Sequence, residues 1–164
     1  MIDSIDANLA AVEAADAAAA NGAEAQGAMR QQIRPAVTKA AELARDAENR
    51  ARDRRHVIGK FTARERLDLQ LDSGAFEEIG RFRGGDINKG VAGSAVITGF
   101  GEVWGRKVAV YAQDFSVRGG SLGVAEGRKI CHLMDQALAL RVPIIALIDS
   151  GGARIQEGVA ALTE

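Results

Sequence analysis

Two glycine turns carry the residues whose types and spacing are best suited to chemistry. The later turn, at residues 150–152 (Ser-Gly-Gly), follows an apolar run at residues 142–148 that has the composition of a buried strand. Adjacent glycines let a ligand approach backbone N–H groups closely. A helix beginning near Ala153 would direct its unpaired N–H groups and positive dipole end at the same point. The turn therefore predicts an anion or oxyanion site, and a plain tight turn is the alternative interpretation.

The earlier turn, at residues 119–121, reads Gly-Gly-Ser and also precedes a helical pattern. If both turns lie at the same edge of a sheet, they border one crevice, which is the usual place for a ligand in an open α/β sheet. The two loops together would then hold a single carbonyl oxygen.

Other site types fail on spacing or on missing partners. A Walker loop needs Gly-Lys followed by Ser or Thr, whereas the basic pair after Gly127 runs into Ile130, and no Gly-x-Gly-x-x-Gly occurs. Ser150 as a nucleophile would need a histidine base. The two histidines lie in a charged arm and inside a long helical stretch, so serine hydrolysis is disfavoured. Cys131 lies in that same apolar stretch and is predicted to be a core residue.

The elements that position these turns begin with a helical region. Residues 33–74 are predicted to form a helical arm, and residues 1–32 an alanine-rich acidic extension that is helix-prone, with disorder as the alternative. From Arg30 to Arg66, eleven basic and five acidic side chains give a local charge of about +6. We expect a solvated helix face there, and contact with a partner or a polyphosphate is the alternative.

A capping-box spacing, Thr62 followed three residues later by Glu65, predicts a short helix that ends at Gly74.

The rest of the chain alternates between strand and helix patterns. Residues 76–79 predict a brief strand, residues 95–100 and 107–111 a β-hairpin, and residues 122–140 a helix with apolar positions at helical spacing. The apolar run at 142–148 adds another strand. This order predicts an α/β fold in which helices cover a sheet.

Composition excludes several classes of protein. A net charge of -1 and a pI near 6.2 give no reason to expect nucleic-acid binding. No run approaches the ~20 apolar residues of a membrane span. The acidic start is unlike a signal or transit peptide. We therefore expect a cytoplasmic protein with no nucleic-acid and no membrane partner.

Three segments together resemble the carboxyltransferase (beta) subunit of biotin-dependent acyl-CoA carboxylases. They are residues 58–67 (IGKFTARERL), residues 112–116 (AQDFS) with 119–123 (GGSLG), and residues 149–158 (DSGGARIQEG). The resemblance covers roughly residues 33–164, and the last segment is the most specific.

The resemblance implies a crotonase-like (ClpP/crotonase) fold of strand-strand-helix units with a helical amino-terminal extension. Because such relatives are much longer, residues 75–164 are expected to be the start of the acyl-CoA-binding N-domain. The chain is then an incomplete domain, a fragment that lacks the biotin-facing half and is inactive alone.

The resemblance also assigns roles to the two turns. Gly151 and Gly152 would be catalytic, offering backbone N–H groups to the thioester oxygen, and Gly119, Gly120 and Ser121 would bind substrate as the other wall. A carboxyl group would move from carboxybiotin to the α carbon of an acyl-CoA through an enolate, with no metal. A biotin carboxylase or biotin carboxyl carrier subunit would carry the carboxybiotin, and the family suggests a hexamer.

Two questions stay open in the sequence. Arg154 is predicted to bind substrate through a CoA phosphate, but a cation at a helix start opposes the dipole, so an ion pair with Glu157 or Asp149 is the alternative. Arg128 and Lys129 are expected on a solvated face, with a phosphate contact as the alternative. The function alternatives are a non-catalytic acyl-CoA-binding or assembly module, or a decarboxylase of the same family.

Overall fold

The computed structural model describes residues 2–162, and the chain divides into two compact units, Met1–Lys39 and Ala40–Glu164. Helix α1 (Ile2–Val57) contributes to both. Side chains at positions 26–39 are exposed, whereas Ala40 and Ala51 are buried, with 1% and 2% of their surface exposed. Small alanines on one helix face let residues 40–57 of α1 pack closely against the rest of the second unit. No helix within residues 2–162 combines the length and the apolar character needed to cross a membrane.

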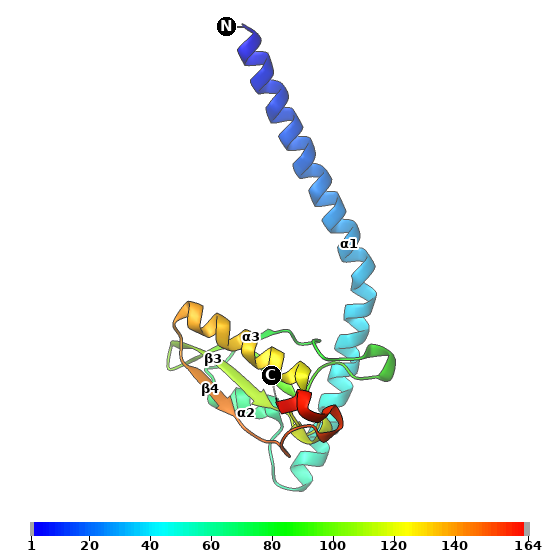
Figure 1. Ribbon diagram of the computed structural model, residues 1–164, viewed down its shortest axis with the longest axis vertical. Coiled ribbons are helices and arrows are strands. Elements are labelled where there is room, and N and C mark those ends of the chain that lie inside the picture. The colour runs from blue at the N-terminus through cyan, green and yellow to red at the C-terminus, as the bar shows by residue number, and fades with distance from the viewer. Residues whose placement is uncertain (1, 163–164) are drawn as a thin grey trace. The chain divides into compact units, whose positions relative to one another are not determined.

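The second unit is built on one four-stranded sheet in the order β1-β2-β3-β4 (Figure 1). Its strands are β1 (Glu77–Ile79), β2 (Val96–Val103), β3 (Arg106–Gln113) and β4 (Ile144–Leu147). The first three run antiparallel and β4 runs parallel to β3. A parallel neighbour needs a crossover, which helix α3 (Val124–Leu140) supplies. The predicted hairpin, helix and following strand are confirmed.

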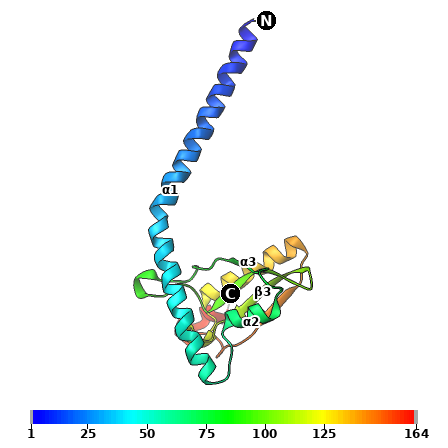
Figure 2. The ribbon, with the colours of Figure 1, turned by 180° about the vertical axis from the view of Figure 1, so that it is seen from behind.

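Two helices cover opposite faces of the sheet, as Figures 1 and 2 show. Side chains alternate along β3 because successive residues of a strand face opposite sides. Val108 and Val110 join the cluster around Leu67 of helix α2 (Ala63–Gln70). Ala109 packs with Leu133 of α3 on the other face. Full burial of a leucine such as Leu133 is worth about 1.5–3 kcal/mol, so each helix is held by its apolar side.

Helix α2 begins with the predicted capping box. The Glu65 N–H donates to Thr62 Oγ1 at 3.2 Å, and the Thr62 N–H donates to Glu65 Oε2 at 2.8 Å. These bonds satisfy N–H groups that have no partner within the helix. The helix ends at Gln70, before the predicted end at Gly74, because Leu71 already adopts an extended conformation and enters the core.

Two expectations about burial are wrong. Cys131 is exposed because the buried stripe of α3 runs through Ile130, Leu133 and Ala137, which turns position 131 away from the sheet. Strand β4 is half-buried to exposed, since it lies at the edge of the sheet with β3 as its neighbour. An apolar run alone does not reveal how many neighbours a strand has.

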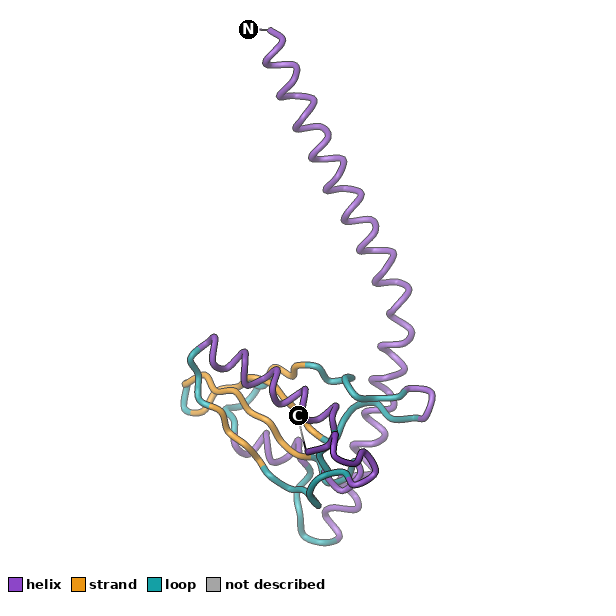
Figure 3. Tube along the Cα trace, in the orientation of Figure 1, coloured by secondary structure: helices purple, strands orange, loops and turns teal. Residues whose placement is uncertain are grey.

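The expected helix beginning near Ala153 is also wrong. Ala153 forms a parallel bridge with Leu122, and a 3₁₀ segment, η3, follows at Ile155–Leu162. Gly158 interrupts η3 with non-helical angles (φ 61°, ψ −144°). Figure 3 shows η3 as a short helical stretch near the C-terminus. Because 3₁₀ geometry has poorer hydrogen bonds, the dipole argument for an anion site here loses its support.

Candidate functional site

The two glycine turns meet at the carboxyl ends of β3 and β4, as the sequence predicts. The Gly151 N–H donates to the Gly119 carbonyl at 2.9 Å, and the Leu122 N–H donates to the Gly152 carbonyl at 3.0 Å. Ser150 Oγ donates to the Gly120 carbonyl at 2.7 Å. The loops are therefore joined directly by backbone and hydroxyl hydrogen bonds.

Gly120 is required by this close approach. It is buried, has a positive φ of 66°, and a Cβ at this position would overlap the carbonyl oxygen of Asp149. A side chain would force the two loops apart. The first loop also holds Arg118 and Gly119 at positive φ, 50° and 64°, so the turn is strained at a non-glycine residue next to the site.

The backbone N–H groups predicted for a ligand have partners within the loops. The Gly151 N–H is bonded to a backbone carbonyl, as described above, while the Gly152 N–H donates to Ser150 Oγ at 3.0 Å. A hydroxyl oxygen is an exchangeable acceptor because it can rotate away. Gly152 is exposed, and a Cβ built on it meets nothing within 4 Å. Of the two N–H groups, that of Gly152 is the more readily offered to a ligand.

Arg154 is buried, with 6% of its surface exposed, and belongs to a cluster of ion pairs. Its guanidinium pairs with Glu126 Oε1 at 2.9 Å and with Glu157 Oε1 at 2.7 Å. Of the two alternatives for an ion pair, Glu157 is present, and Glu126 is a partner that sequence reasoning missed.

The pKa values in this cluster follow from those contacts. Burial alone raises the pKa of Glu126, but hydrogen bonds from Arg154 and from the Ala95 N–H outweigh it, and the pKa lies below its ordinary value. Burial lowers the pKa of Arg154, yet its hydrogen bonds with Glu126 and Glu157 raise it overall. The hydrogen bond from Arg154 lowers the pKa of Glu157. All three side chains are charged at neutral pH.

A second arginine supports the same turn from α1. Arg55, buried in the charged arm, forms an ion pair with Asp149, and its guanidinium lies 5.2 Å from the centre of the Phe115 ring. The Asp149 N–H donates to Gln113 Oε1 at 3.0 Å. The arm was expected to be solvated, and for Arg55 this is wrong. The partner lies 94 residues away, so no local sequence signal could reveal it.

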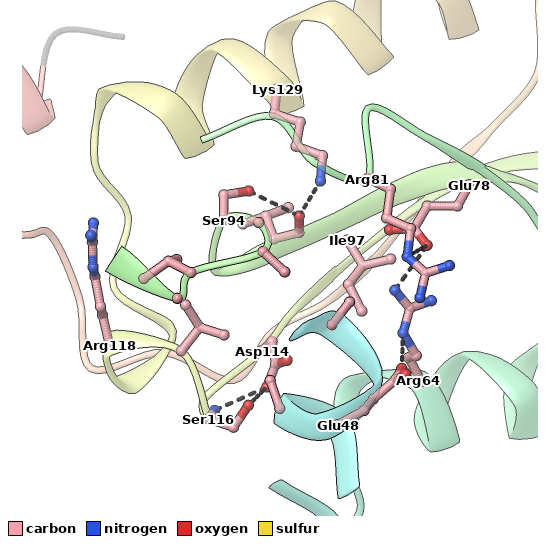
Figure 4. A pocket seen from close by; sticks show the side chains of 18 residues that line it. Glu48, Arg64, Glu78, Arg81, Ser94, Ile97, Asp114, Ser116, Arg118 and Lys129 are labelled. Atoms are coloured by element: carbon pink, nitrogen blue, oxygen red, sulfur yellow. Dashed lines mark hydrogen bonds and ion pairs between the residues drawn. The ribbon is translucent and has the colours of Figure 1, made fainter. Parts of the chain in front are cut away.

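A cavity of about 300 Å³ lies beside the first loop (Figure 4). Charged side chains from several elements line it, and those shown include Arg64, Glu78, Arg81, Arg118 and Lys129. Arg118, one of its lining residues, directly precedes Gly119 in the chain, so the cavity lies next to the first glycine loop.

Lys129 is buried at 3% exposure, so its expected place on a solvated face is wrong. Its Nζ donates to the Val96 carbonyl at 2.6 Å. Burial lowers the pKa of Lys129 to about 8. Its neighbour Arg128 is exposed.

Ser150 lacks the arrangement of a nucleophile. Its hydroxyl bonds to the Gly120 carbonyl, while His56 Nε2 lies 2.9 Å from Glu65 Oε1 at the start of α2. His132 is exposed on α3. Neither histidine is therefore paired with Ser150, and the site consists of backbone N–H groups beside an ion cluster of one arginine and two glutamates.

Residues 54–164 match the Carboxyl transferase domain family. The chain belongs to this family. A propionyl-CoA carboxylase beta chain from Roseobacter denitrificans is 50% identical over 116 residues, which cover 67% of this chain and 23% of the relative. The mitochondrial propionyl-CoA carboxylase beta chain of Homo sapiens is 50% identical over 119 residues, 67% of this chain and 22% of the relative. The chain thus spans less than a quarter of the length of these curated relatives.

Solved carboxyl transferases share the fold. A transcarboxylase 12S structure, described as a hexamer assembly with methylmalonyl-coenzyme A bound, matches with a TM-score of 0.70 and 37% identity over 82% of this chain and 28% of that chain. The beta subunit of geranyl-CoA carboxylase from P. aeruginosa matches with a TM-score of 0.59 and 30% identity, covering 82% and 24%. The expected crotonase-like fold is confirmed as a partial domain.

Proposed function

We propose that the chain is the acyl-CoA-binding part of a carboxyltransferase, with the joined glycine loops as the thioester site. The observation that carries this proposal is the direct meeting of the two loops, Gly151 N–H to Gly119 carbonyl and Ser150 Oγ to Gly120 carbonyl. Family membership and relatives named propionyl-CoA carboxylase support an acyl-CoA substrate.

The chemistry of an acyl thioester suits this pair of loops. Loss of a proton from the carbon beside the thioester, which the biotin left after carboxyl transfer would accept, places negative charge on the thioester oxygen, and backbone N–H donors stabilise that charge. In our proposal the oxygen replaces Ser150 Oγ as the acceptor of the Gly152 N–H. Gly151 supplies the second donor once its bond to Gly119 lengthens. Removal of one such donor costs about 2.7–4 kcal/mol of barrier in enzymes.

The first loop and the cavity would bind the rest of the substrate. Gly119, Gly120 and Ser121 would form the opposite wall, and the basic side chains of the adjacent cavity, Arg118 among them, would bind a CoA phosphate. Direct contact between Arg154 and the substrate stays a prediction, and it would require one of the present ion pairs of the guanidinium to break.

Further parts of the proposal concern the whole protein. The carboxyl donor would be carboxybiotin held by a separate biotin carboxylase or carrier subunit, which supplies an activated carboxyl group. A hexameric assembly in the cytoplasm is proposed by analogy with the family, in which transcarboxylase 12S is described as a hexamer.

Carboxyl transfer tests the proposal. A longer protein that contains this chain together with the biotin-facing half, combined with a biotinylated carrier and its carboxylase, is expected to fix radiolabelled bicarbonate onto propionyl-CoA. Gly152→Pro, which removes the N–H, should abolish fixation, while the matched exposed variant Arg106→Gln should retain it. Fixation that survives in Gly152→Pro at full rate would disprove the oxyanion role, and acyl-CoA binding without fixation in the wild type would favour a non-catalytic module.

A further inference from the structure

We infer that Arg154 is a positioning residue that holds the two glycine loops in register, so that its role lies in fixing the oxyanion site and not in contacting substrate. The inference rests on the proposed function for its meaning, but its geometry and its first test do not depend on turnover.

Arg154 connects the two loops through its backbone and through its side chain. Its backbone belongs to the segment after Gly152, and its N–H donates to the Leu122 carbonyl at 2.7 Å. Its side chain reaches back to the first loop, where Nη2 donates to the Ser121 carbonyl at 2.8 Å. One residue therefore bonds to the first loop through both main chain and side chain.

The carboxylates that hold Arg154 are themselves fixed by backbone donors. Glu126 accepts the Ala95 N–H at 3.1 Å and the Gly123 N–H at 3.1 Å. Glu157 Oε2 accepts the Val124 N–H at 2.8 Å. The cluster thus joins the start of β2, the start of α3 and η3 to the two loops. A planar guanidinium with several donors in fixed directions suits this task better than an ammonium group.

Gly123 shows how tightly the cluster is packed. A Cβ at this position would lie 2.6 Å from Arg154 Nη1 and would also overlap the Glu157 carboxylate. The guanidinium therefore fills the space against the α3 backbone. With Nη1 on Glu157, Nη2 shared by Glu126 and Ser121, and Nε 3.4 Å from Ser121 Oγ, an incoming phosphate would have to break existing bonds.

Amide hydrogen exchange in the full chain is the first test. Arg154→Gln should speed exchange at residues 119–122 and 150–153 while leaving the β2–β3 hairpin protected. The reason is that the variant loses the hydrogen bonds and ion pairs of Arg154, here called the Arg154 clamp, which hold these loops locally. Glu157→Gln, a milder change at a half-buried side chain, should give a smaller effect at the same loops and serves if Arg154→Gln fails to fold. Arg106→Gln is the matched control. Unchanged loop exchange in either clamp variant would overturn the inference.

Kinetics in the assembled carboxylase distinguish positioning from substrate contact. Arg154→Gln should lower kcat by on the order of tenfold to a hundredfold, as misplaced catalytic groups do, while the KM for acyl-CoA changes by less than about threefold. Arg154→Lys, which keeps the positive charge but loses the planar guanidinium with its fixed donor directions, should not restore kcat. A raised KM with unchanged kcat would instead indicate a substrate contact. If the wild type shows no transfer, the proposed function fails, yet the exchange result still decides whether the clamp exists.

Discussion

Lys129 illustrates how a single buried charge shapes this molecule. Its side chain lies among Glu78, Glu126, Arg64 and Arg83, and burial lowers its pKa from 10.5 to about 8. Between those two pH values the unfolded chain holds a proton that the folded chain has lost. Folding stability therefore rises with pH across this window, and the difference corresponds to about 3 kcal/mol. Below pH 8 both states are protonated and the contribution is constant.

Lys129→Met should remove this pH dependence. Relative to the variant, the wild type is expected to gain stability by about 3 kcal/mol as pH rises from 8 to 10.5. The Val96 carbonyl keeps a donor in the variant, because Ser94 Oγ also lies 3.2 Å away. Urea unfolding at several pH values measures the difference, with the exposed Lys107→Met as control. Parallel stability curves for wild type and Lys129→Met would contradict the account.

At the scale of residues, the sequence predicted the two glycine turns but not the buried charged side chains around them. Two glycine turns after apolar strands are a local signal, and both turns lie where they were expected. Arg55, Glu126 and Lys129 gain their roles from partners that are distant in sequence, such as Val96 for Lys129 and Asp149 for Arg55. Charge patterning alone indicated solvated faces at Arg55 and Lys129. The signal that could have pointed to Glu126 is its spacing from Gly123, which fits a bond back to the helix start.

Helix α2 is the element whose ends are best explained by local sequence. Its capping box also lowers the pKa of Glu65 to about 2, chiefly because the Thr62 N–H donates to the Glu65 carboxylate. That contribution to stability is present above pH 4.5 and is lost as pH falls toward 2.

Thr62→Ala should destabilise the fold by about 1 kcal/mol, because the Glu65 N–H loses its acceptor at the start of the helix. Leu67 and Leu71 follow in the core, so the loss propagates beyond the cap. The denaturant midpoint measures the change, and Thr62→Ser, which keeps the hydroxyl, is the matched control. Equal midpoints for Thr62→Ala and the wild type would show that the cap contributes nothing.

Other elements show the limits of local patterns. The period of two predicted the hairpin, and the period near 3.6 predicted α3, because both patterns reflect burial on one face. Residues after Gly152 carry a helical pattern too, yet the bridge from Ala153 to Leu122 and the positive φ of Gly158 prevent an α-helix. A tertiary contact determines the conformation of that segment, and no local sequence pattern predicts this contact.

At the scale of the whole chain, the second unit brings residues 40–57 of α1, the sheet and the two loops into one structure. Arg55 from α1 and Arg154 after the second turn hold that turn from two directions, through Asp149 and through the first loop. The order of strands and helices followed from pattern, and the family followed from three motifs that the matched region confirms. The packing of α1 against the turn could not be predicted, since it depends on contacts across most of the chain.

The measurement that tests the central claim most directly is a titration of the isotopically labelled chain followed through its backbone amide resonances. Propionyl-CoA is compared with S-propyl-CoA, a thioether that lacks the carbonyl oxygen. We predict that propionyl-CoA shifts the resonances of Gly151 and Gly152 while the thioether leaves them in place, because only the thioester offers an acceptor to these N–H groups. Equal shifts with both ligands, or no shift at millimolar propionyl-CoA, would contradict a thioester site at the joined glycine loops.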